Sequence, residues 1–428
     1  MKKGRDTMTS VISRLAGAGA ISVLLASCAM PVGGFPTGPA NPPARTVNPN
    51  AGHGNQAGLE RWVVDFRPRA LAAGIRPATF DRAMTAARYN PEVIRLDNHQ
   101  AEFTKPVWEY LDGAVSESRI TTGRQKSAQL SSTLAAIESR YGVPREVVLA
   151  VWGMESNFGA NRGSMRIIPS LATLAYDGRR GAFFEEQLVA ALRIIQAGDV
   201  DAAHMVGSWA GAMGHTQFMP TSFLTHAVDF NRDGRRDIWS DDPTDSLAST
   251  AAYLARSGWQ RGVPWAVEVR LPAGFDFGQA GKGVRKPGAQ WAAMGVQRVG
   301  GGGGMPGFNG SILTPAGARG PAFLISDNFR AISQYNNSDS YVLGVGILSD
   351  RIAGRAGVQG AWPRGDAQLT TAQRTEIQRR LNALGFDAGE VDGKFGSQTT
   401  EAIRAFQRAR GVQPDGYATP ALLALLRG

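Results

Sequence analysis

The sequence contains very little cysteine: of its 428 residues only Cys28 is one. A single thiol excludes an intramolecular disulfide and a thiolate metal cluster. Long basic runs are also missing, although the net charge is +10. Nucleic-acid binding requires clusters of Lys and Arg interleaved with aromatic residues, and their absence excludes nucleic acid as a partner. The mild basicity serves solubility, and it is also compatible with an anionic polymer as partner.

The first 28 residues form a distinct segment. A basic start is followed by the apolar run Leu15–Ala26, which suits a signal peptide and is too short to span a bilayer. The run ends in the letters LASC at Cys28, which resemble the lipobox of bacterial lipoproteins. The resemblance implies cleavage before Cys28, lipidation of its thiol and, because Ala29 follows, transport to the outer membrane of a Gram-negative bacterium. The alternative is an ordinary signal peptide that ends near a cysteine.

Residues 28–58 are rich in Pro, Gly and Asn and show almost no apolar periodicity. Such a segment cannot bury enough surface to fold, so we predict a flexible tether. Its root-mean-square reach of roughly 30 Å would hold a domain away from a membrane.

Residues 59–360 have mostly helical patterning. We expect one helix from Pro144 to Gly159 and another from Asp245 or Ser246 to Gly258. Within 263–325 the pattern changes, because residues 265–271 alternate like a strand and five glycines follow at 300–304. These features predict a mainly α body with a small β-containing insert.

After a linker at 361–368, residues 369–428 form a compact unit. Apolar residues recur at helical spacing in three segments, and the first two end at Gly385 and Gly411. We predict a module of three short helices.

One carboxylate continues an apolar stripe. Val147, Val151 and Glu155 fall at i, i+4 and i+8 of the helix that begins at Pro144. A carboxyl group held against apolar surface loses hydration when ionised, so its pKa rises and it can act as a general acid. The alternative is a glutamate that turns out to solvent near a helix end.

Three strings place this glutamate in a family. They are WGMESNFG at Trp152–Gly159, SLATLAY at Ser170–Tyr176 and GAMGHTQFMP at Gly211–Pro220. Their order and content resemble the membrane-bound lytic murein transglycosylase B family, glycoside hydrolase family 103, over residues 59 to 355. The resemblance implies a lysozyme-like helical catalytic domain. It also implies an enzyme that cuts the glycan strands of peptidoglycan in the periplasm.

A second catalytic carboxylate is not evident. A conventional glycosidase needs one about 5 to 9 Å from the first, yet Met205–Ala227, which lines the cleft opposite the glutamate in this family, contains no Asp or Glu. The resemblance implies that Glu155 alone protonates the β-1,4 glycosidic oxygen between N-acetylmuramic acid and N-acetylglucosamine. Glu155 would then take the proton of the muramyl C6 hydroxyl, which closes a 1,6-anhydro ring without water or a catalytic cofactor.

The resemblance carries further residues into the substrate site. They are Ser208, Gln217, Phe218, Tyr253, Tyr335, Tyr341, Tyr110 and Arg180. From pattern alone Tyr253 favours core packing, whereas Tyr335 and Tyr341 flank a polar segment and are expected to be exposed. His215 and Thr216 occupy variable positions of the motif and receive no role.

Residues 229–237 follow the first nine positions of an EF-hand loop, with glycine at the sixth. The twelfth position is Ser240, which cannot donate two oxygens, so the last ligand must come from Asp241, Asp242 or Asp245. The family resemblance favours Asp245. The ligands of a structural Ca²⁺ would be Asp229, Asn231, Asp233, the Arg235 carbonyl and Asp245, and these hard oxygen donors disfavour zinc. The alternative is a solvated turn.

The C-terminal unit resembles the common three-helix peptidoglycan-binding domain. The matching segments are residues 377–386, 391–396 and 405–407. The sequence thus predicts a signal peptide (1–27), a tether (28–58), a catalytic domain (59–360), a linker (361–368) and a peptidoglycan-binding domain (369–428), in a monomer anchored by lipid.

Three other functions remain open from the residues. The chain could be a non-catalytic wall-binding lipoprotein, against which the glutamate argues. It could be a hydrolytic lysozyme on the same scaffold, which would release reducing ends. A calcium sensor would need paired EF-hands, and the sequence has one such loop.

Overall fold

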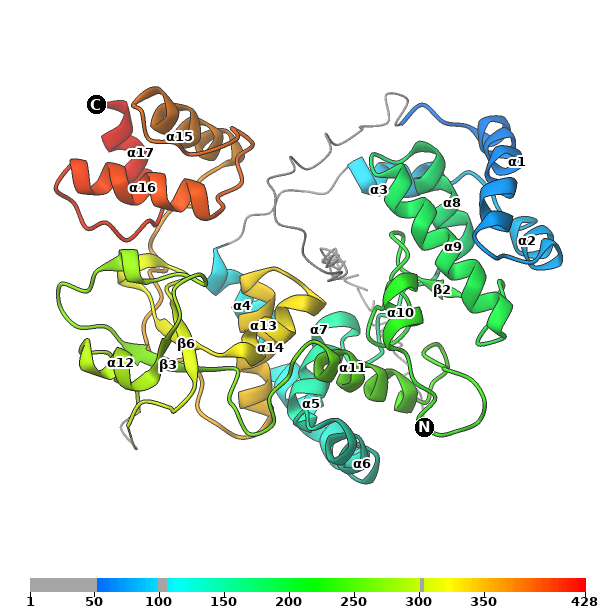
Figure 1. Cartoon of the computed structure of the whole chain (residues 1–428), viewed down its shortest axis with the longest axis horizontal. Helices are drawn as coiled ribbons and strands as arrows, with labels where there is room; N and C mark the ends of the chain where they lie inside the picture. The colour runs from blue at the N-terminus through cyan, green and yellow to red at the C-terminus, as the bar shows by residue number, and fades with distance from the viewer. Residues whose placement is uncertain (1–51, 99–105, 301–303) are drawn as a thin grey trace, which may run out of the picture.

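The structure is a computed structural model that describes residues 52–98, 106–300 and 304–428 (Figure 1). The predicted signal peptide, Cys28 and most of the predicted tether lie outside these residues. Within the three described ranges, no helix has both the length and the apolarity needed to cross a bilayer.

The N-terminal end of the described chain is held by a buried carboxylate. The amides of Gly52 and Gly54 donate to the two oxygens of Asp177 at 2.8 and 3.1 Å. The hydroxyl of Tyr89 donates to the same carboxylate at 2.6 Å, and Asp177 is 2% exposed. Three donors therefore attach this segment to the end of helix α8 (Ile167–Asp177).

The first helix begins at Gln56, two residues before the predicted end of the tether at about Gly58. Helix α1 (Gln56–Ala72) already includes Gly58, because the side chain of Asn55 accepts the Gly58 amide at 2.9 Å and starts the helix. An added Cβ on Gly58 would meet the Tyr176 hydroxyl at 1.9 Å, so a small residue is required where α1 packs on the body.

The helical body contains most of the remaining chain. Its helices are α2 (Pro77–Met84), α3 (Pro91–Asn98), α4 (Val107–Ala114), α5 (Glu117–Gln129), α6 (Ser131–Tyr141), α7 (Arg145–Ser156), α8, α9 (Gly181–Ala197), α10 (Pro220–His226), α11 (Thr244–Arg256), α13 (Asp327–Tyr335) and α14 (Asp339–Ile352). Helix α7 is central: all residues of 147–153 are buried, and α5, α6, α11 and α14 pack around it. A helix buried on all sides explains why its sequence is apolar beyond one stripe.

The predicted end of α7 at Gly159 is wrong. The helix ends at Ser156, and Asn157 caps it in the left-handed conformation with φ 50°. Asparagine tolerates this conformation better than other residues with a Cβ, so it replaces the glycine stop that we expected.

The predicted β-containing insert is confirmed. Its antiparallel sheet has the order β4-β6-β7-β3-β5, with strands β3 (Ala266–Arg270), β4 (Lys286–Pro287), β5 (Gln297–Arg298), β6 (Asn309–Leu313) and β7 (Ala322–Ile325). Helix α12 (Gly288–Ala293) covers it, and Trp291 is fully buried in its separate core. A second, two-stranded sheet pairs β1 (Met165–Arg166) with β2 (Val206–Gly207) beside α8.

The C-terminal module has the three predicted helices, α15 (Thr371–Ala383), α16 (Ser397–Ala409) and α17 (Pro420–Arg427), around its own apolar core. It lies beside the insert and on the opposite side of the molecule from α1 and α2 (Figure 1). The amide of Ala318 donates to Asp415 at 3.0 Å, and Arg364 in the linker pairs with Asp112 of α4 at 2.7 Å. These contacts attach the module to the body.

Candidate active site

Helix α7 ends in a tight reversal shortly after Glu155. Asn157 and Phe158 both have left-handed φ values, 50° and 57°. The Phe158 ring folds back over Gly153, where an added Cβ would lie 2.7 Å from it, and packs edge-on against Trp152 with ring centroids 5.6 Å apart. Two successive left-handed residues with side chains are costly, and such strain is concentrated at functional sites.

The carboxyl group of Glu155 is half-buried and bonded to one tyrosine. The hydroxyl of Tyr341, on α14, donates to Glu155 Oε1 at 2.6 Å. Burial raises the pKa of Glu155 to about 8, although the Tyr341 hydrogen bond acts in the opposite direction. No other carboxylate of the described chain contributes to this pKa. Glu155 is therefore a carboxylic acid that can stay protonated at neutral pH.

Two further tyrosines lie within the electrostatic reach of Glu155. Its negative charge contributes to raising the pKa of Tyr335 and of Tyr110, after burial, which is the larger cause. The hydroxyl of Tyr335 donates to the Thr216 carbonyl, whereas the buried hydroxyl of Tyr110 has no partner among the described residues. An unpaired buried hydroxyl beside an acid is a group that a substrate oxygen could satisfy.

The expected exposure of Tyr335 and Tyr341 is wrong. They are 8% and 1% exposed, because Tyr335 ends α13 and Tyr341 lies in the first turn of α14, and both helices turn these rings inward. The polar residues between them form the surface turn, in which Ser338 caps α14. The expected core packing of Tyr253 is confirmed: it is 8% exposed, and its hydroxyl donates to the Gln334 carbonyl.

The glycine-rich segment 205–219 folds back on itself beside α7. Main-chain pairing joins Met213 to both Gly207 and Phe218. An added Cβ on Gly207 would meet the Ala212 carbonyl oxygen at 2.1 Å, and one on Gly214, whose φ is 70°, would meet the Ile238 oxygen at 2.2 Å. The glycines are thus needed for close backbone packing, in addition to any approach to a sugar.

The predicted binding residues of this segment take part in its folding. Ser208 Oγ accepts the Ala212 amide at 3.0 Å. The side-chain amide of Gln217 donates to the carbonyls of Gly214 and Arg162 at 2.8 and 3.0 Å, while its Oε1 has no hydrogen-bond partner among the described residues. Phe218 is buried, with its ring centroid 5.8 Å from that of Tyr335.

Arg180 is not brought to Glu155 by any described contact. It precedes α9, and its guanidinium carbon lies over the rings of Phe183 and Phe184 at 5.2 and 5.0 Å from their centroids. The side chain is exposed. Its assignment to the substrate site stays a prediction.

The acidic loop, residues 229–245, is closed by side chains that accept its own amides. Asp229 accepts the amides of Asp233 and Gly234 at 3.2 and 2.9 Å. Asp245, at the start of α11 and 2% exposed, accepts those of Phe230 and Asp237 at 2.8 and 3.0 Å. Burial raises the pKa of Asp245, and the charge of Asp229 adds to this effect.

The donors of the acidic loop fit a hard cation in kind. The loop offers four oxygen-bearing side chains, Asp229, Asn231, Asp233 and Asp245, and the charge of Asp229 is close enough to raise the pKa of Asp245. In the present arrangement, however, no three Asp, Glu, His or Cys side chains of the described residues gather around one point. Their oxygens are engaged by loop amides, so a cation would have to replace some of those hydrogen bonds.

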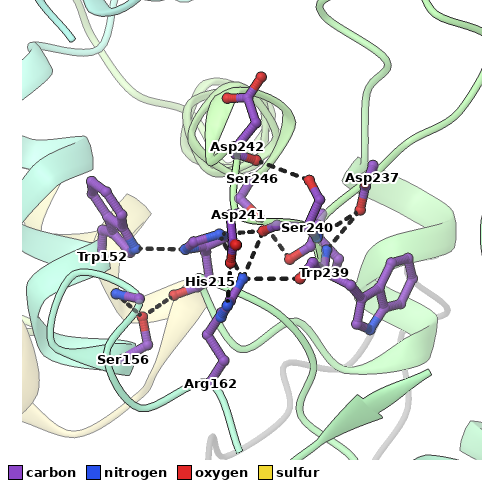
Figure 2. A network of polar contacts seen from close by, with 12 residues as sticks. Trp152, Ser156, Arg162, His215, Asp237, Trp239, Ser240, Asp241, Asp242 and Ser246 are labelled. Atoms are coloured by element: carbon purple, nitrogen blue, oxygen red, sulfur yellow. Dashed lines mark hydrogen bonds and ion pairs between the residues drawn. The ribbon is translucent and has the colours of Figure 1, made fainter. Parts of the chain in front are cut away.

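The sequence did not predict a polar network that contacts Trp152 and Ser156 in the last turn of α7, the turn that carries Glu155. Figure 2 shows His215 between Trp152 of α7 and the end of the acidic loop, with Ser156 and Arg162 beside it. The expectation that position 215 carries no role rested on its variability within the motif. No local signal could identify it, because its side-chain partner Trp152 is 63 positions away.

Comparison with known families assigns the chain. The transglycosylase SLT domain family matches residues 58–350, and the peptidoglycan binding domain family matches residues 370–426. The chain belongs to this transglycosylase family. The predictions of a lysozyme-like transglycosylase fold, of lytic transglycosylase activity on peptidoglycan and of a C-terminal peptidoglycan-binding domain are therefore confirmed.

Several relatives are similar over most of this transglycosylase. It is 30% identical over 292 residues to membrane-bound lytic murein transglycosylase B of Escherichia coli, covering 63% of this chain and 76% of that protein. It is 52% identical to SltB3 of Pseudomonas aeruginosa, solved with NAG-anhNAM-pentapeptide and with NAG-NAM-pentapeptide, with a TM-score of 0.83 and coverage of 86% and 99%. Slt35 of Escherichia coli in complex with calcium is 26% identical, with a TM-score of 0.58 and coverage of 73% and 98%.

Proposed function

We propose that this transglycosylase cleaves the β-1,4 bond between N-acetylmuramic acid and N-acetylglucosamine with Glu155 as its only catalytic carboxylate. The observation that carries the proposal is the half-buried Glu155, whose pKa is raised to about 8 with Tyr341 as its hydrogen-bond donor. A glycosidase with two catalytic carboxylates places the second about 5 to 9 Å from the first, where it would influence this pKa. Among the described residues, none does.

The chemistry needs one group that first gives and then takes a proton. Protonated Glu155 donates to the glycosidic oxygen, and the bond from that oxygen to the muramyl C1 breaks. The substrate's acetamido group stabilises the positive charge at C1, and the Tyr341 hydroxyl stabilises the carboxylate that Glu155 has become. The oxygen of the muramyl C6 hydroxyl then attacks C1, and the hydroxyl proton passes to Glu155, which is protonated again. The products are a 1,6-anhydromuramyl end and a free glucosamine 4-hydroxyl.

The remaining residues of the proposed substrate site fall into two groups, those with a polar atom available to a sugar and those that make structural contacts. Gln217 offers an oxygen, and Tyr110 a buried hydroxyl, that a sugar could engage. Ser208, Phe218 and Tyr253 make structural contacts that also shape the walls of such a site. The relative SltB3 was solved in complex with muropeptides, which supports a muropeptide as the ligand of this chain.

The mass of the products tests the proposal. Residues 52–428, incubated with purified peptidoglycan, should release muropeptides whose muramyl ends lack one water relative to those released by a hydrolytic lysozyme. Mass spectrometry in water enriched in ¹⁸O should find no ¹⁸O at the muramyl C1. Incorporation of ¹⁸O would favour the hydrolytic lysozyme, and an inactive protein that still binds the wall would favour the non-catalytic wall-binding alternative.

The C-terminal module is proposed to raise the local concentration of glycan at the catalytic domain. It is attached to the body by defined contacts, including that between Ala318 and Asp415. A second binding site on the same chain makes the next binding event intramolecular. This role requires no catalysis by the module itself.

We propose that the acidic loop binds a structural Ca²⁺ through the side chains of Asp229, Asn231, Asp233 and Asp245 and the Arg235 carbonyl. The alternating oxygen side chains and the buried Asp245 support it, as does the calcium complex of Slt35. Bound Ca²⁺ would neutralise the repulsion between Asp229 and Asp245. The ion would act on the stability of the loop and not on bond cleavage.

Calcium should therefore raise the melting temperature of the wild-type protein. At a hundredfold excess of Ca²⁺ over its Kd the linkage is about 2.7 kcal/mol, which corresponds to a rise of about 4 °C for a domain of this size. The Asp245→Asn variant should lose this rise, whereas the exposed control Asp65→Asn should keep it. Equal melting temperatures of the wild type with Ca²⁺ and with a chelator would contradict the proposal.

The enzyme acts on the cell wall, and we propose that it does so as a periplasmic lipoprotein of the outer membrane. The support is the basic and apolar start of the chain and the letters LASC ending at Cys28. Mass spectrometry of the protein purified from membranes should find a lipid-modified cysteine as its first residue. A Cys28→Ala variant that still fractionates with the outer membrane would contradict lipid anchoring.

A further inference from the structure

A hydrogen-bond network connects the end of the acidic loop to the catalytic turn of α7 through one histidine. Trp152 Nε1 donates to His215 Nδ1 at 3.2 Å, and His215 Nε2 lies 2.8 Å from the Ser240 carbonyl oxygen. Figure 2 shows the imidazole between these two partners. His215 is 4% exposed, so water does not replace either partner easily.

The partners of His215 define its tautomer. An indole nitrogen can only donate and a carbonyl oxygen can only accept, so Nδ1 must be unprotonated and Nε2 must carry the hydrogen. Arg162 lies 3.3 Å from Nε2 and also binds the Ser240 carbonyl, which adds positive charge on that side. Burial and Arg162 both lower the pKa of His215, although Ser240, Asp241 and Asp237 act in the opposite direction. The ring is therefore a neutral, directional bridge.

The same residue also holds the chain on the other side of Glu155. The hydroxyl of Ser156 donates to the His215 carbonyl and accepts the Gly159 amide at 2.9 Å. Trp152 precedes Glu155 by three positions and Ser156 follows it directly. His215 is thus hydrogen-bonded to the last turn of α7 on both sides of Glu155, through its side chain at Trp152 and through its main chain at Ser156.

Close neighbours of the His215 imidazole hold the ring in one orientation. An added Cβ on Gly159, whose φ is 85°, would lie 2.6 Å from His215 Nδ1. The Trp152 and His215 rings meet edge to face with centroids 5.6 Å apart. A pocket of about 330 Å³ opens beside the network, lined by Lys126, Trp152, Arg162 and His215 among others. Glu155 is not among its lining residues.

We propose that His215 is a positioning residue, which orients the carboxyl group of Glu155 by bridging the segment 239–241 to the last turn of α7. The proposal rests on the proposed role of Glu155. The main-chain amides of Asn157 and Phe158 close the end of α7 on the carbonyls of Gly153 and Trp152 at 3.2 and 3.3 Å. The His215 bridge adds side-chain and main-chain contacts at Trp152 and Ser156, on both sides of Glu155. Small displacements of a catalytic carboxyl group lower kcat more than they weaken substrate binding.

Two substitutions separate the two halves of the bridge. In His215→Asn the side-chain oxygen replaces Nδ1 and can still accept from Trp152, whereas in His215→Gln the side-chain amide replaces Nε2 and can still donate to Ser240. The matched control is His204→Gln, because His204 is an exposed histidine whose ring, among the residues that the structure describes, pairs with Asp201 of its own turn. Initial rates are measured on soluble glycan chains that carry stem peptides, by counting anhydromuramyl ends.

We expect His215→Gln to lower kcat about tenfold or more with KM within about twofold, because the link to α7 is lost. His215→Asn should retain about a third or more of the wild-type kcat on the same scale. The basic limb of the kcat/KM profile should move to lower pH in His215→Gln, since a less confined Glu155 is better hydrated and its pKa falls. His204→Gln should match the wild type in each measurement. Where His215→Gln does not fold, as judged by its melting curve, Trp152→Phe removes the same hydrogen bond and takes its place.

Equal kcat values in the three histidine variants would overturn the proposal, as would losses of kcat without a shift of the basic limb. Glu155→Gln is assayed in parallel to separate this failure from that of the proposed function. If Glu155→Gln keeps its activity, the role of Glu155 is wrong and the bridge has no catalytic group to position. If Glu155→Gln is inactive while the His215 variants match His204→Gln, only the positioning role fails.

Discussion

The Glu155→Gln variant is expected to cleave glycan about 10²-fold to 10⁴-fold more slowly than the wild type, because general acid–base catalysis contributes a factor in this range. Glutamine has nearly the same shape and can keep the hydrogen bond with Tyr341, but it has no proton to give to the glycosidic oxygen. It also cannot take the proton of the C6 hydroxyl, so both steps of the proposed mechanism fail. Release of anhydromuramyl ends measures the loss.

The loss must come from chemistry and not from binding or folding. Binding of Glu155→Gln to insoluble peptidoglycan should equal that of the wild type, because the C-terminal module is unaffected. Glu146→Gln is the matched control, since Glu146 lies in the first turn of the same helix. It should keep full activity. Comparable rates for Glu155→Gln and the wild type would remove Glu155 from the mechanism.

The activity is expected to depend on pH through one acidic group that must be protonated. Burial raises the pKa of Glu155 to about 8, so kcat/KM for soluble glycan should stay level up to that pH and then fall about tenfold per unit. Cleavage rates measured between pH 5 and pH 10 test this expectation. A basic limb near pH 5 would mean that Glu155 is ionised at neutral pH and cannot be the acid.

The same ionisation should affect stability with a defined sign. The ordinary pKa of the group is 4.5, so between pH 4.5 and about 8 the unfolded chain has lost a proton that the folded enzyme keeps. The unfolded state then binds fewer protons, and this group's contribution to stability falls with rising pH, by about 1.4 kcal/mol per unit before screening. The Glu155→Gln variant escapes this loss. Its melting temperature should equal that of the wild type near pH 4.5 and exceed it at pH 8.

Local sequence patterns predicted what depends on local structure. The apolar stripe through Val147 and Val151 placed Glu155 on a helix, because helical periodicity is set within a few turns. The strand at 266–270 and the three helices of the C-terminal module followed from the same kind of signal. The family resemblance, and not the periodicity, selected Glu155 among the possible acids.

Long-range packing explains the failures. Tyr341 was expected to be exposed because its neighbours in sequence are polar, yet its ring is buried against Glu155, a partner 186 positions away. His215 receives no role from the sequence because it occupies a variable position of the motif, and its contacts with Trp152 and Ser240 form only in the tertiary structure. The end of α7 was misplaced because Asn157 adopts a conformation that a sequence pattern assigns more readily to glycine.

The attachment of Gly52 and Gly54 to Asp177 would have a mechanical consequence if the enzyme is held, as we propose, by a lipid at Cys28. A pull on the preceding segment would reach the body at the carboxylate of Asp177, where three donors share it, before it reaches α1. Force would then pass along α8, most of whose residues are buried. Helix α1 would not be detached from the body. The glycan could thus be pulled against the proposed lipid anchor without force on the turn that carries Glu155, which lies on a different helix.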